Sequence, residues 1–405
     1  MFLSVFALRS PFVPAAFVVA LASGLPGCSS DDDDGASPPD GVTCASVSRA
    51  DNAQTLVNAA ANTAAGGCVV VSGALTSTSP VIVAEGVTLV GAKGTRPSIA
   101  VTEAVGTSAI YLGARAQLGN LDVVAAPKVG VSLTGTDVRI FDVKVTGAKN
   151  AGIAVMPVND AVTATLEDVV AEKNGYGVYA NGDGVTLTMK GGRISENGGT
   201  SLSAGAGLVA VAGAHVTLDG VTIEKNEGTG VLLDGAKTRA VVRTSTVAEN
   251  RERGIWAQGL QGTLDEPALA VHDTQVSKNR IVGVGGVELK GIIIVGGSVK
   301  ETVASPVPTN LATNELVGDG VGIFGGSTDF KIERTNFASN ERAAGVVDGS
   351  EVGIIIVGGK VEPGPGLKFV VQNSKADVQI ADSDKSVLDK PLPISAPKIQ
   401  TPNVF

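Results

Sequence analysis

A glycine followed by a short apolar strand recurs through most of the chain, and this repeat constrains the fold more than any other feature. Uninterrupted spacings are about 22 to 25 residues. The repeats begin at Gly130, Gly152, Gly177, Gly207, Gly230, Gly254, Gly286, Gly322 and Gly345. Each unit holds two further β-rich stretches, as in Val216–Asn226. Three short strands separated by turns make one coil of a solenoid, which buries its apolar side only against neighbouring coils.

An asparagine stands shortly before the glycine strand in most units. Asparagine tolerates the left-handed backbone of a tight turn, and stacked asparagine side chains can hydrogen-bond from coil to coil. We therefore predict a structural ladder of Asn150, Asn174, Asn197, Asn226, Asn250, Asn279 and Asn340.

This pattern resembles the asparagine ladder and repeat of the pectate-lyase-like superfamily of right-handed parallel β-helices. The resemblance covers residues 68–382. It implies an all-β, right-handed parallel β-helix solenoid of about 12 coils. The matching residues are structural, so the resemblance indicates a fold and says little about activity. The composition agrees, because only 3% of residues are aromatic and a narrow stack of aliphatic side chains needs few aromatic rings.

The start of the chain resembles an export signal. Arg9 is the only charge before the apolar run 11–27, which is too short and too interrupted by proline and glycine to span a membrane as a stable helix. The run ends in Leu-Pro-Gly-Cys at Cys28, which resembles the lipobox of bacterial lipoproteins. That resemblance implies a signal peptide over 1–27, lipidation of Cys28, and a lipid anchor at the outer membrane or cell surface. The alternative is ordinary secretion, with cleavage near Ser23 or Gly27.

Residues 28–43 read as an acidic, disordered tether. Four consecutive aspartates, Asp31–Asp34, lie among glycine, serine and proline, a composition that cannot bury apolar surface. The formal charge of the chain is −9 and its pI is about 4.9, which argues against nucleic acid as a partner.

Both ends of a solenoid need caps. Residues 44–67 are expected to form the N-terminal cap, with a short helix over 51–64 that starts at Asp51 or Asn52. Export to an oxidising compartment predicts that Cys44 and Cys68 pair. Their loop would stabilise the fold by about 3 kcal/mol. At the other end, the proline-rich tail 383–405 is expected to cover the last coil.

Period-2 alternation predicts that the residue after each glycine points inward and the next one outward. The outward stripe would be Ser132, Ala154, Tyr179, Val209, Leu232, Trp256, Glu288, Phe324 and Val347. If exposed, Tyr179, Trp256 and Phe324 could stack on sugar rings or contact a partner protein. The alternative is that insertions cover the stripe.

A second outward row lies on the strand before the asparagine turn and comprises Glu167, Lys190, Asp219, Arg243, His272 and Glu333. In lyases of the resembling superfamily the matching face carries acidic Ca²⁺ ligands and a basic residue for proton abstraction. Asp219, Arg243 and His272 are the trio that could form such a catalytic site. The alternating signs favour a different interpretation, a ladder of ion pairs between coils. No cofactor is expected unless the chain is a lyase, in which case Ca²⁺ is expected.

Two copies of Gly-Ile-Ile-Ile-Val-Gly-Gly, starting at Gly291 and Gly353, place an apolar patch outward. It consists of Ile293, Val295, Ile355 and Val357. We expect the insertion 301–314, the tail or a partner to cover it.

The sequence therefore predicts a non-catalytic, lipid-anchored β-helix that serves as a scaffold, adhesin or glycan-binding element. Its expected partners are the membrane, through the lipid, and a polysaccharide or another envelope protein. The alternative is a polysaccharide lyase or glycoside hydrolase of the same superfamily, because a fold does not by itself determine a function.

Overall fold

The computed structural model describes residues 37–102, 108–125, 128–158, 160–198, 205–306, 316–350, 352–362, 365–375, 378–381, 384–386, 388 and 390–392. The chain separates into two units, 1–35 and 36–405, and every structural statement below concerns the second. The predicted signal peptide, Cys28 and the aspartate run lie outside the described residues. No helix in the described part of the chain is long and apolar enough to cross a membrane.

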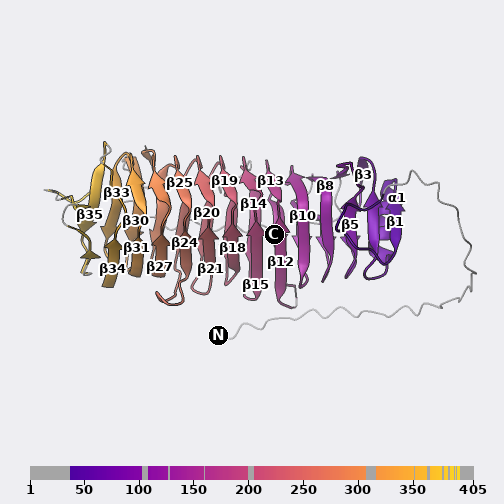
Figure 1. Cartoon of the computed structure of the whole chain (residues 1–405), viewed down its shortest axis with the longest axis horizontal. Helices are drawn as coiled ribbons and strands as arrows, with labels where there is room; N and C mark the ends of the chain where they lie inside the picture. Colours follow the sequence, from indigo (N-terminus) through magenta and orange to yellow (C-terminus); the bar gives the residue numbers. More distant parts are fainter. Residues whose placement is uncertain are drawn as a thin grey trace, which may run out of the picture. The chain divides into compact units, whose positions relative to one another are not determined.

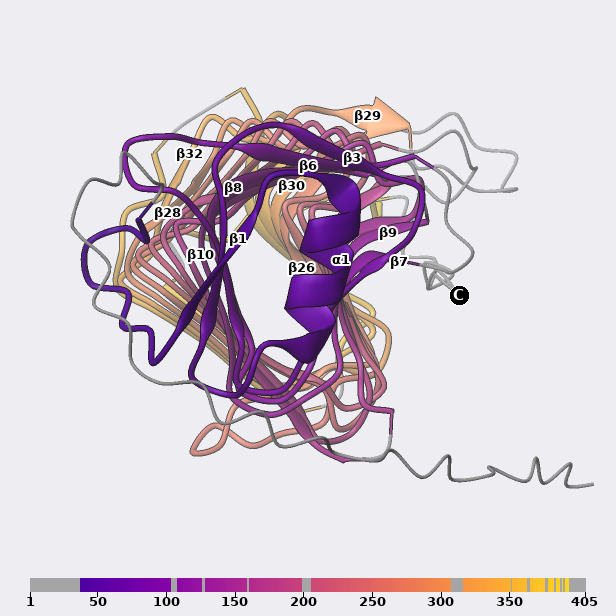
Figure 2. The same ribbon diagram turned by 90° about the vertical axis from the view of Figure 1, so that its right-hand side faces the viewer.

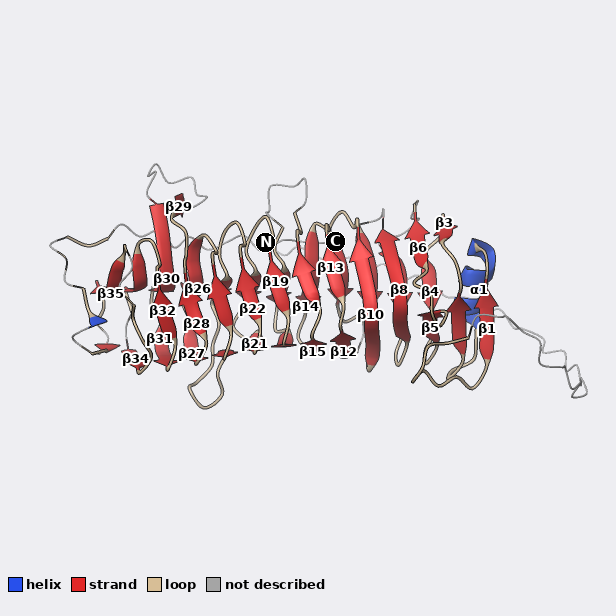
Figure 3. Ribbon diagram, turned by 45° about the horizontal axis from the view of Figure 1, so that its top comes forward, coloured by secondary structure: helices blue, strands red, loops and turns tan. Residues whose placement is uncertain are grey.

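Strands stacked in parallel dominate this unit (Figures 1 and 3). Each middle coil contributes one strand to a sheet that we call sheet 2, and two strands to a larger sheet, in which they form a first and a second line. Sheet 2 comprises β4 (Val81–Val83), β7 (Ser108–Leu112), β9 (Val129–Leu133), β11 (Ala151–Val155), β14 (Tyr176–Asn181), β17 (Leu208–Val211), β20 (Val231–Asp234), β23 (Ile255–Gln258), β26 (Ile281–Val287), β30 (Leu316–Phe324), β33 (Ala343–Asp348) and β35 (Leu367–Gln372). β29 (Ser305–Pro306) pairs antiparallel with β30.

The first line comprises β1 (Val47–Ala50), β2 (Cys68–Val71), β5 (Thr88–Gly91), β8 (Gln117–Ala125), β10 (Val138–Thr146), β12 (Val162–Glu167), β15 (Val185–Lys190), β18 (His215–Asp219), β21 (Arg239–Arg243), β24 (Leu269–His272), β27 (Lys290–Val295), β31 (Thr328–Glu333), β34 (Val352–Val357) and β36 (Val378–Gln379). The second line comprises the ends of β8 and β10 with β3 (Leu75–Ser77), β6 (Ser98–Val101), β13 (Val170–Glu172), β16 (Arg193–Ser195), β19 (Thr222–Glu224), β22 (Thr246–Ala248), β25 (Gln275–Ser277), β28 (Ser298–Lys300) and β32 (Asn336–Ala338). The twelve strands on the path of sheet 2 correspond to one strand per coil, so the predicted solenoid of about twelve coils is confirmed.

The core is a continuous column of aliphatic side chains inside the coils. The residues after the first six repeat glycines are in register and fully buried: Val131, Ile153, Val178, Leu208, Val231 and Ile255. Each coil thus buries its interior against the coils on either side, as the period-2 pattern predicts.

For the last three repeats the predicted register is wrong. Ile255 pairs with Val284, and Val284 with Val321, so Gly283 and Gly320 are the equivalents of Gly254. In the next coil Val321 pairs with Gly345, so Gly345 itself takes the inward position that was predicted for Val346. This shift by one residue places Val347 in the core and turns Val346 outward, because neighbouring strand residues face opposite sides.

The N-terminal end is capped by α1 (Ala53–Asn62), which lies across the opening of the first coils in Figure 2. Asn52 caps the helix: its side chain accepts a 2.9 Å hydrogen bond from the Thr55 backbone N–H, and the Thr55 hydroxyl oxygen accepts one from Asn52 N–H. Leu56 and Ala60 are buried against the core.

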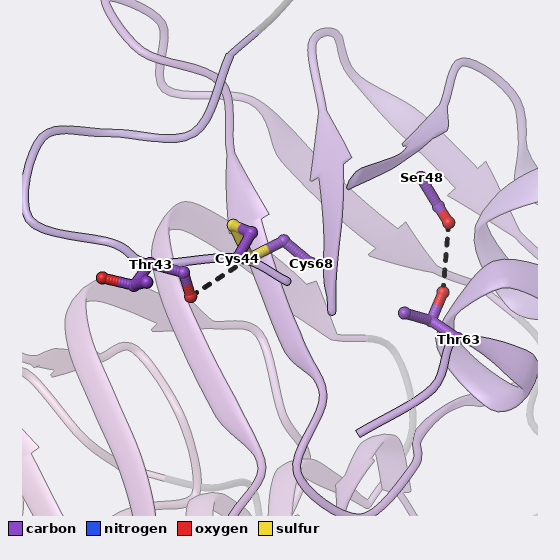
Figure 4. Close-up of a disulfide and its surroundings, with 5 residues drawn as sticks. All are labelled: Thr43, Cys44, Ser48, Thr63 and Cys68. Carbon is purple, nitrogen blue, oxygen red and sulfur yellow. Dashed lines mark hydrogen bonds between the residues drawn. A yellow bond between two sulfur atoms is a disulfide. The ribbon is translucent and has the colours of Figure 1, made fainter. Parts of the chain in front are cut away.

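The predicted disulfide between Cys44 and Cys68 is present, with a Cα–Cα distance of 5.4 Å (Figure 4). It ties the segment before β1 to the start of β2. Close to it, the Thr63 hydroxyl donates a 3.3 Å hydrogen bond to Ser48, which joins the end of α1 to β1. The bridge and the helix therefore hold the same end of the solenoid.

Candidate binding faces

The outward side of the first line forms the first candidate, which we call the open face. It comprises Thr163, Thr165, Glu167, Thr186, Thr188, Lys190, His215, Thr217, Asp219, Arg239, Val241, Arg243 and His272, all exposed or half-buried. These residues alternate with buried ones along each strand, as in β15, where Leu187 and Met189 point into the core. Register pairing places Thr165 beside Thr188, and Thr188 beside Thr217.

The predicted charged row lies on this face, with consecutive members in register: Glu167, Lys190, Asp219, Arg243 and His272. Glu333 belongs to the same row, but Val295 of β27 separates it from His272. The row is therefore continuous over five coils and then interrupted by an apolar residue.

The Asp219 carboxylate is engaged at both oxygens. Oδ1 accepts a 2.8 Å hydrogen bond from the Thr244 hydroxyl, and Oδ2 lies 2.9 Å from Arg243 Nη2. These bonds, first that of Thr244 and then that of Arg243, lower the pKa of Asp219. An ionised carboxylate that is bonded at both oxygens suits an ion-pair ladder better than proton abstraction.

The described residues of the open face do not form a set of metal ligands. Within the described residues, no three or more His, Cys, Asp or Glu side chains gather closely enough to hold a metal ion. On the charged row Glu167 lies beside Lys190, and Asp219 lies between Lys190 and Arg243, so these strands do not build the cluster of carboxylates that a bare Ca²⁺ site requires.

The outer side of sheet 2 forms the second candidate, which we call the covered face. Of the two interpretations of the aromatic stripe, the covered one is correct, because Tyr179, Trp256 and Phe324 are only 2%, 1% and 3% exposed. Together with aliphatic neighbours they make a second apolar cluster on the outside of the sheet. Stacking on a sugar ring would require that the cover over these rings be displaced.

The aromatic row is also less regular than predicted. Trp256 is followed in register by Gly285 and then Gly322, so two coils lack a side chain at this position. Phe324 lies two residues further along β30 and fills the space, since a Cβ on Gly322 would come within 2.5 Å of its ring. The rings of Phe324 and Trp256 are 6.3 Å apart. Glu288, also predicted in this row, lies in the turn after β26.

A buried arginine on the covered face was not predicted. The Arg253 guanidinium lies 4.5 Å from the centre of the Trp256 ring, and the residue is 2% exposed. Burial lowers the pKa of Arg253 to about 10, and its carboxylate partner Glu252 is 3.4 Å away. Among the described residues, Arg253 Nε and Trp256 Nε1 have no hydrogen-bond partner. Arg253 stands just before the repeat glycine Gly254. At this position the sequence alone does not show whether a side chain lies in the turn or on the outer side of the strand.

The asparagines form a ladder in the turn before sheet 2. Asn197 donates from Nδ2 to Asn226 Oδ1, Asn226 to Asn250, and Asn250 to Asn279, each at 2.9 Å. Thr302 takes the next position and Asn340 the one after it, since Thr302 N–H bonds Asn340 Oδ1.

Asn150 is not part of the ladder, which corrects the prediction. The backbone N–H of Ala148 bonds Asn174 Oδ1, so Ala148 occupies the equivalent position two residues earlier. The left-handed residue of this turn is also not the asparagine but the charged residue before it, as at Lys225 and Glu249. Asparagine is needed here for the hydrogen bonds of its side chain, not for its backbone tolerance.

The predicted apolar patch lies on the first line beyond the open face. Ile293, Val295 and Ile355 are half-buried, and Val357 is 49% exposed. Lys331 and Glu333, whose side chains are 2.7 Å apart, separate its two halves. The expected cover therefore does not extend over Val357.

Comparisons with known proteins agree with this architecture. The family model described as the right handed beta helix region matches residues 129–305. No curated protein matches the chain significantly. Among solved structures, the Dettilon tailspike protein aligns at a TM-score of 0.55 and 14% identity, over 79% of this chain and 64% of its own.

Two further solved structures are enzymes. The catalytic unit of an α-1,3-glucanase from Streptomyces thermodiastaticus aligns at a TM-score of 0.51 and 14% identity, over 86% of this chain and 72% of its own. The A-module of a mannuronan C-5 epimerase from Azotobacter vinelandii aligns at a TM-score of 0.46 and 14% identity, over 84% and 96%. At such identities the alignments with the tailspike and the glucanase show the fold alone.

Proposed function

For this right-handed parallel β-helix we propose a non-catalytic role as a binding scaffold of the cell envelope, which holds polysaccharide on its open face. The observation that carries the proposal is the character of that face: threonine hydroxyls lie beside an acid, Asp219, that is already paired with Arg243. Asp219, the best-placed acid, has both oxygens occupied. The face thus offers hydrogen bonds to a ligand without an unengaged acid at its centre.

The threonines form a regular array. Thr163 and Thr165, Thr186 and Thr188, and then Thr217 point outward from three successive strands. Neighbouring strands lie about 4.8 Å apart, and outward residues repeat about every 6.6 Å along a strand. Each hydroxyl can donate one hydrogen bond and accept two. Such an array suits a ligand with many hydroxyl groups along an extended chain.

The anchor belongs to the same proposal. Lipid on Cys28 would attach the chain to a membrane, and the acidic segment after it would separate the β-helix from the lipid surface. We place the protein at the outer membrane or cell surface. Labelling with a radioactive fatty acid tests this, since Cys28→Ser should abolish incorporation; incorporation that persists would contradict the anchor.

Binding without turnover is the result that tests the function. Residues 36–405 would be incubated with acidic and neutral polysaccharides, with and without Ca²⁺, and both the bound fraction and newly released oligosaccharide measured. We expect retention without product, and severalfold weaker retention after Thr188→Val. The matched control is Thr222→Val, on the second line, which should bind as the parent does.

Product release would overturn the proposal and support the alternative, a lyase or hydrolase. In that case Asp219→Ala, Arg243→Ala or His272→Ala should abolish release, and a lyase should also need Ca²⁺. If no polysaccharide is retained, the glycan-binding function is wrong and a purely structural role remains.

A further inference from the structure

The outward side chains of sheet 2 are exposed in the first coils and buried in the later ones, although the strands continue in register. Ile82, at the start of the outward row of sheet 2, is 55% exposed, and Tyr111 in the next coil is half-buried. From Ser132 onward the row is buried: Ala154 is 1% exposed and Val370, in the last coil, 2%. Something therefore lies over this face from β9 to β35 and leaves its first coils open.

The described part of that cover comes from the C-terminal segment. Leu388 and Leu392 pack against the apolar cluster of the covered face. The Gln372 side chain holds the backbone of Leu392 at two points: Nε2 donates to Leu392 O at 2.9 Å, and Oε1 accepts from Leu392 N–H at 2.8 Å. Gln372 belongs to β35, so the segment is fastened at the last coil.

The length of chain beyond Leu392 matches the length of the buried row. Thirteen residues, 393–405, follow it in the sequence, and Pro393, Pro397 and Pro402 favour an extended conformation. At about 3.1 Å per residue they reach roughly 40 Å. The nine steps from β35 to β9 along sheet 2 amount to about 43 Å at 4.8 Å per strand.

The chemistry of the segment and of the face is also complementary. Ile394, Ile399 and Phe405 supply apolar side chains. Carbonyl groups of an extended, proline-rich chain have no internal hydrogen-bond partner, and they need donors when they are buried. The covered face holds two buried donors that have no partner in the part of the chain that the structure describes, Arg253 Nε and Trp256 Nε1.

We propose that the covered face is a docking surface for the C-terminal segment of this same chain, residues 388–405, which lies over Phe324, Trp256 and Tyr179. Docking on the face of a sheet needs side chains and carbonyls but no ladder of backbone N–H groups, so prolines are compatible with it.

Trp256 is the only tryptophan in the chain and reports on this surface directly. We would compare residues 36–405 with residues 36–386, which keep the contacts of Ser386 with β35. The shortened chain should show a red-shifted tryptophan emission and a severalfold larger acrylamide quenching constant. A synthetic 388–405 peptide should restore protection, and the same peptide with Leu392→Asp should not.

Equal quenching in the two chains would overturn the proposal and assign the cover to another segment, such as the insertion before β17. If the shortened chain does not fold by circular dichroism, the test moves to the double variant Gln372→Ala, Leu392→Asp in residues 36–405. Its quenching constant should also rise, and no change would overturn the proposal.

Discussion

At the scale of single residues, the asparagine ladder shows what the sequence could and could not predict. Seven asparagines near one position of the repeat pointed to a structural row. Asn150 was included because the sequence alone does not distinguish an asparagine at the ladder position from one two residues after it in the same turn. Hydrogen bonding decides membership: the ladder position is the one whose Oδ1 accepts the backbone N–H of the preceding coil, and Asn174 bonds Ala148.

Replacement of Asn226 by alanine should therefore be costly. Asn226 is fully buried, donates to Asn250, and accepts from both the backbone and the side chain of Asn197. The change leaves buried donors of Asn197 unsatisfied, and we expect a loss of about 3 kcal/mol in the free energy of unfolding, measured in urea. Asn150→Ala, outside the ladder, should lose markedly less. Equal losses would contradict the corrected membership.

A buried carboxylate on the second line predicts a pH dependence. Glu172 is 6% exposed and its carboxylate lies 2.6 Å from Lys144 Nζ, which is the main reason that its pKa is lowered. The folded state therefore holds the proton less tightly than the unfolded chain does. The resulting stability is present above the ordinary pKa of 4.5 and is lost as the pH falls through the lower folded value. In the Glu172→Gln variant, the free energy of unfolding should fall less steeply as the pH is lowered. If the fall is as steep as in the parent protein, other acids cause the loss of stability.

At the scale of elements, the strands and the N-terminal helix were predictable because their signals are local. The register of the late coils was not, since the stretch Ile281–Val287 contains three glycines and each could start the repeat. Only pairing with β23 and β30 selects among them. The burial of the covered face was also not predictable from local signals, because Leu388 and Leu392, which pack against it, are distant in the sequence.

The helix α1 should be required to close the core. Leu56 is fully buried beneath it, and we expect Leu56→Ala to lower the free energy of unfolding by about 2 to 4 kcal/mol. The uncapped end should then associate, which size-exclusion chromatography would show as larger species. Asn58→Ala, on the same helix but exposed, serves as the control and should remain monodisperse. A monodisperse Leu56→Ala protein would show that the cap is dispensable for solubility.

At the scale of the whole unit 36–405, stability should vary along the stack of coils. Each coil contacts only its neighbours, so local free energies do not average out over the structure. The relay of asparagine side chains is unbroken from Asn174 to Asn279 and is interrupted at Thr302. Coils within the relay have an extra hydrogen bond at each step that the last coils lack. This difference makes the middle of the stack the most resistant to local opening.

Hydrogen exchange followed by mass spectrometry should resolve this gradient. Backbone amides of β15, β18 and β21 should exchange slowest, and those of β33, β34 and β35 faster, because the relay of asparagine side chains does not extend to the late coils. Asn250→Ala should speed exchange in the coils next to it while leaving β4 and β7 unchanged, as expected for coupling between nearest neighbours. Uniform protection from β4 to β35, or a change that spreads to every coil, would instead mean that the solenoid opens as one cooperative unit.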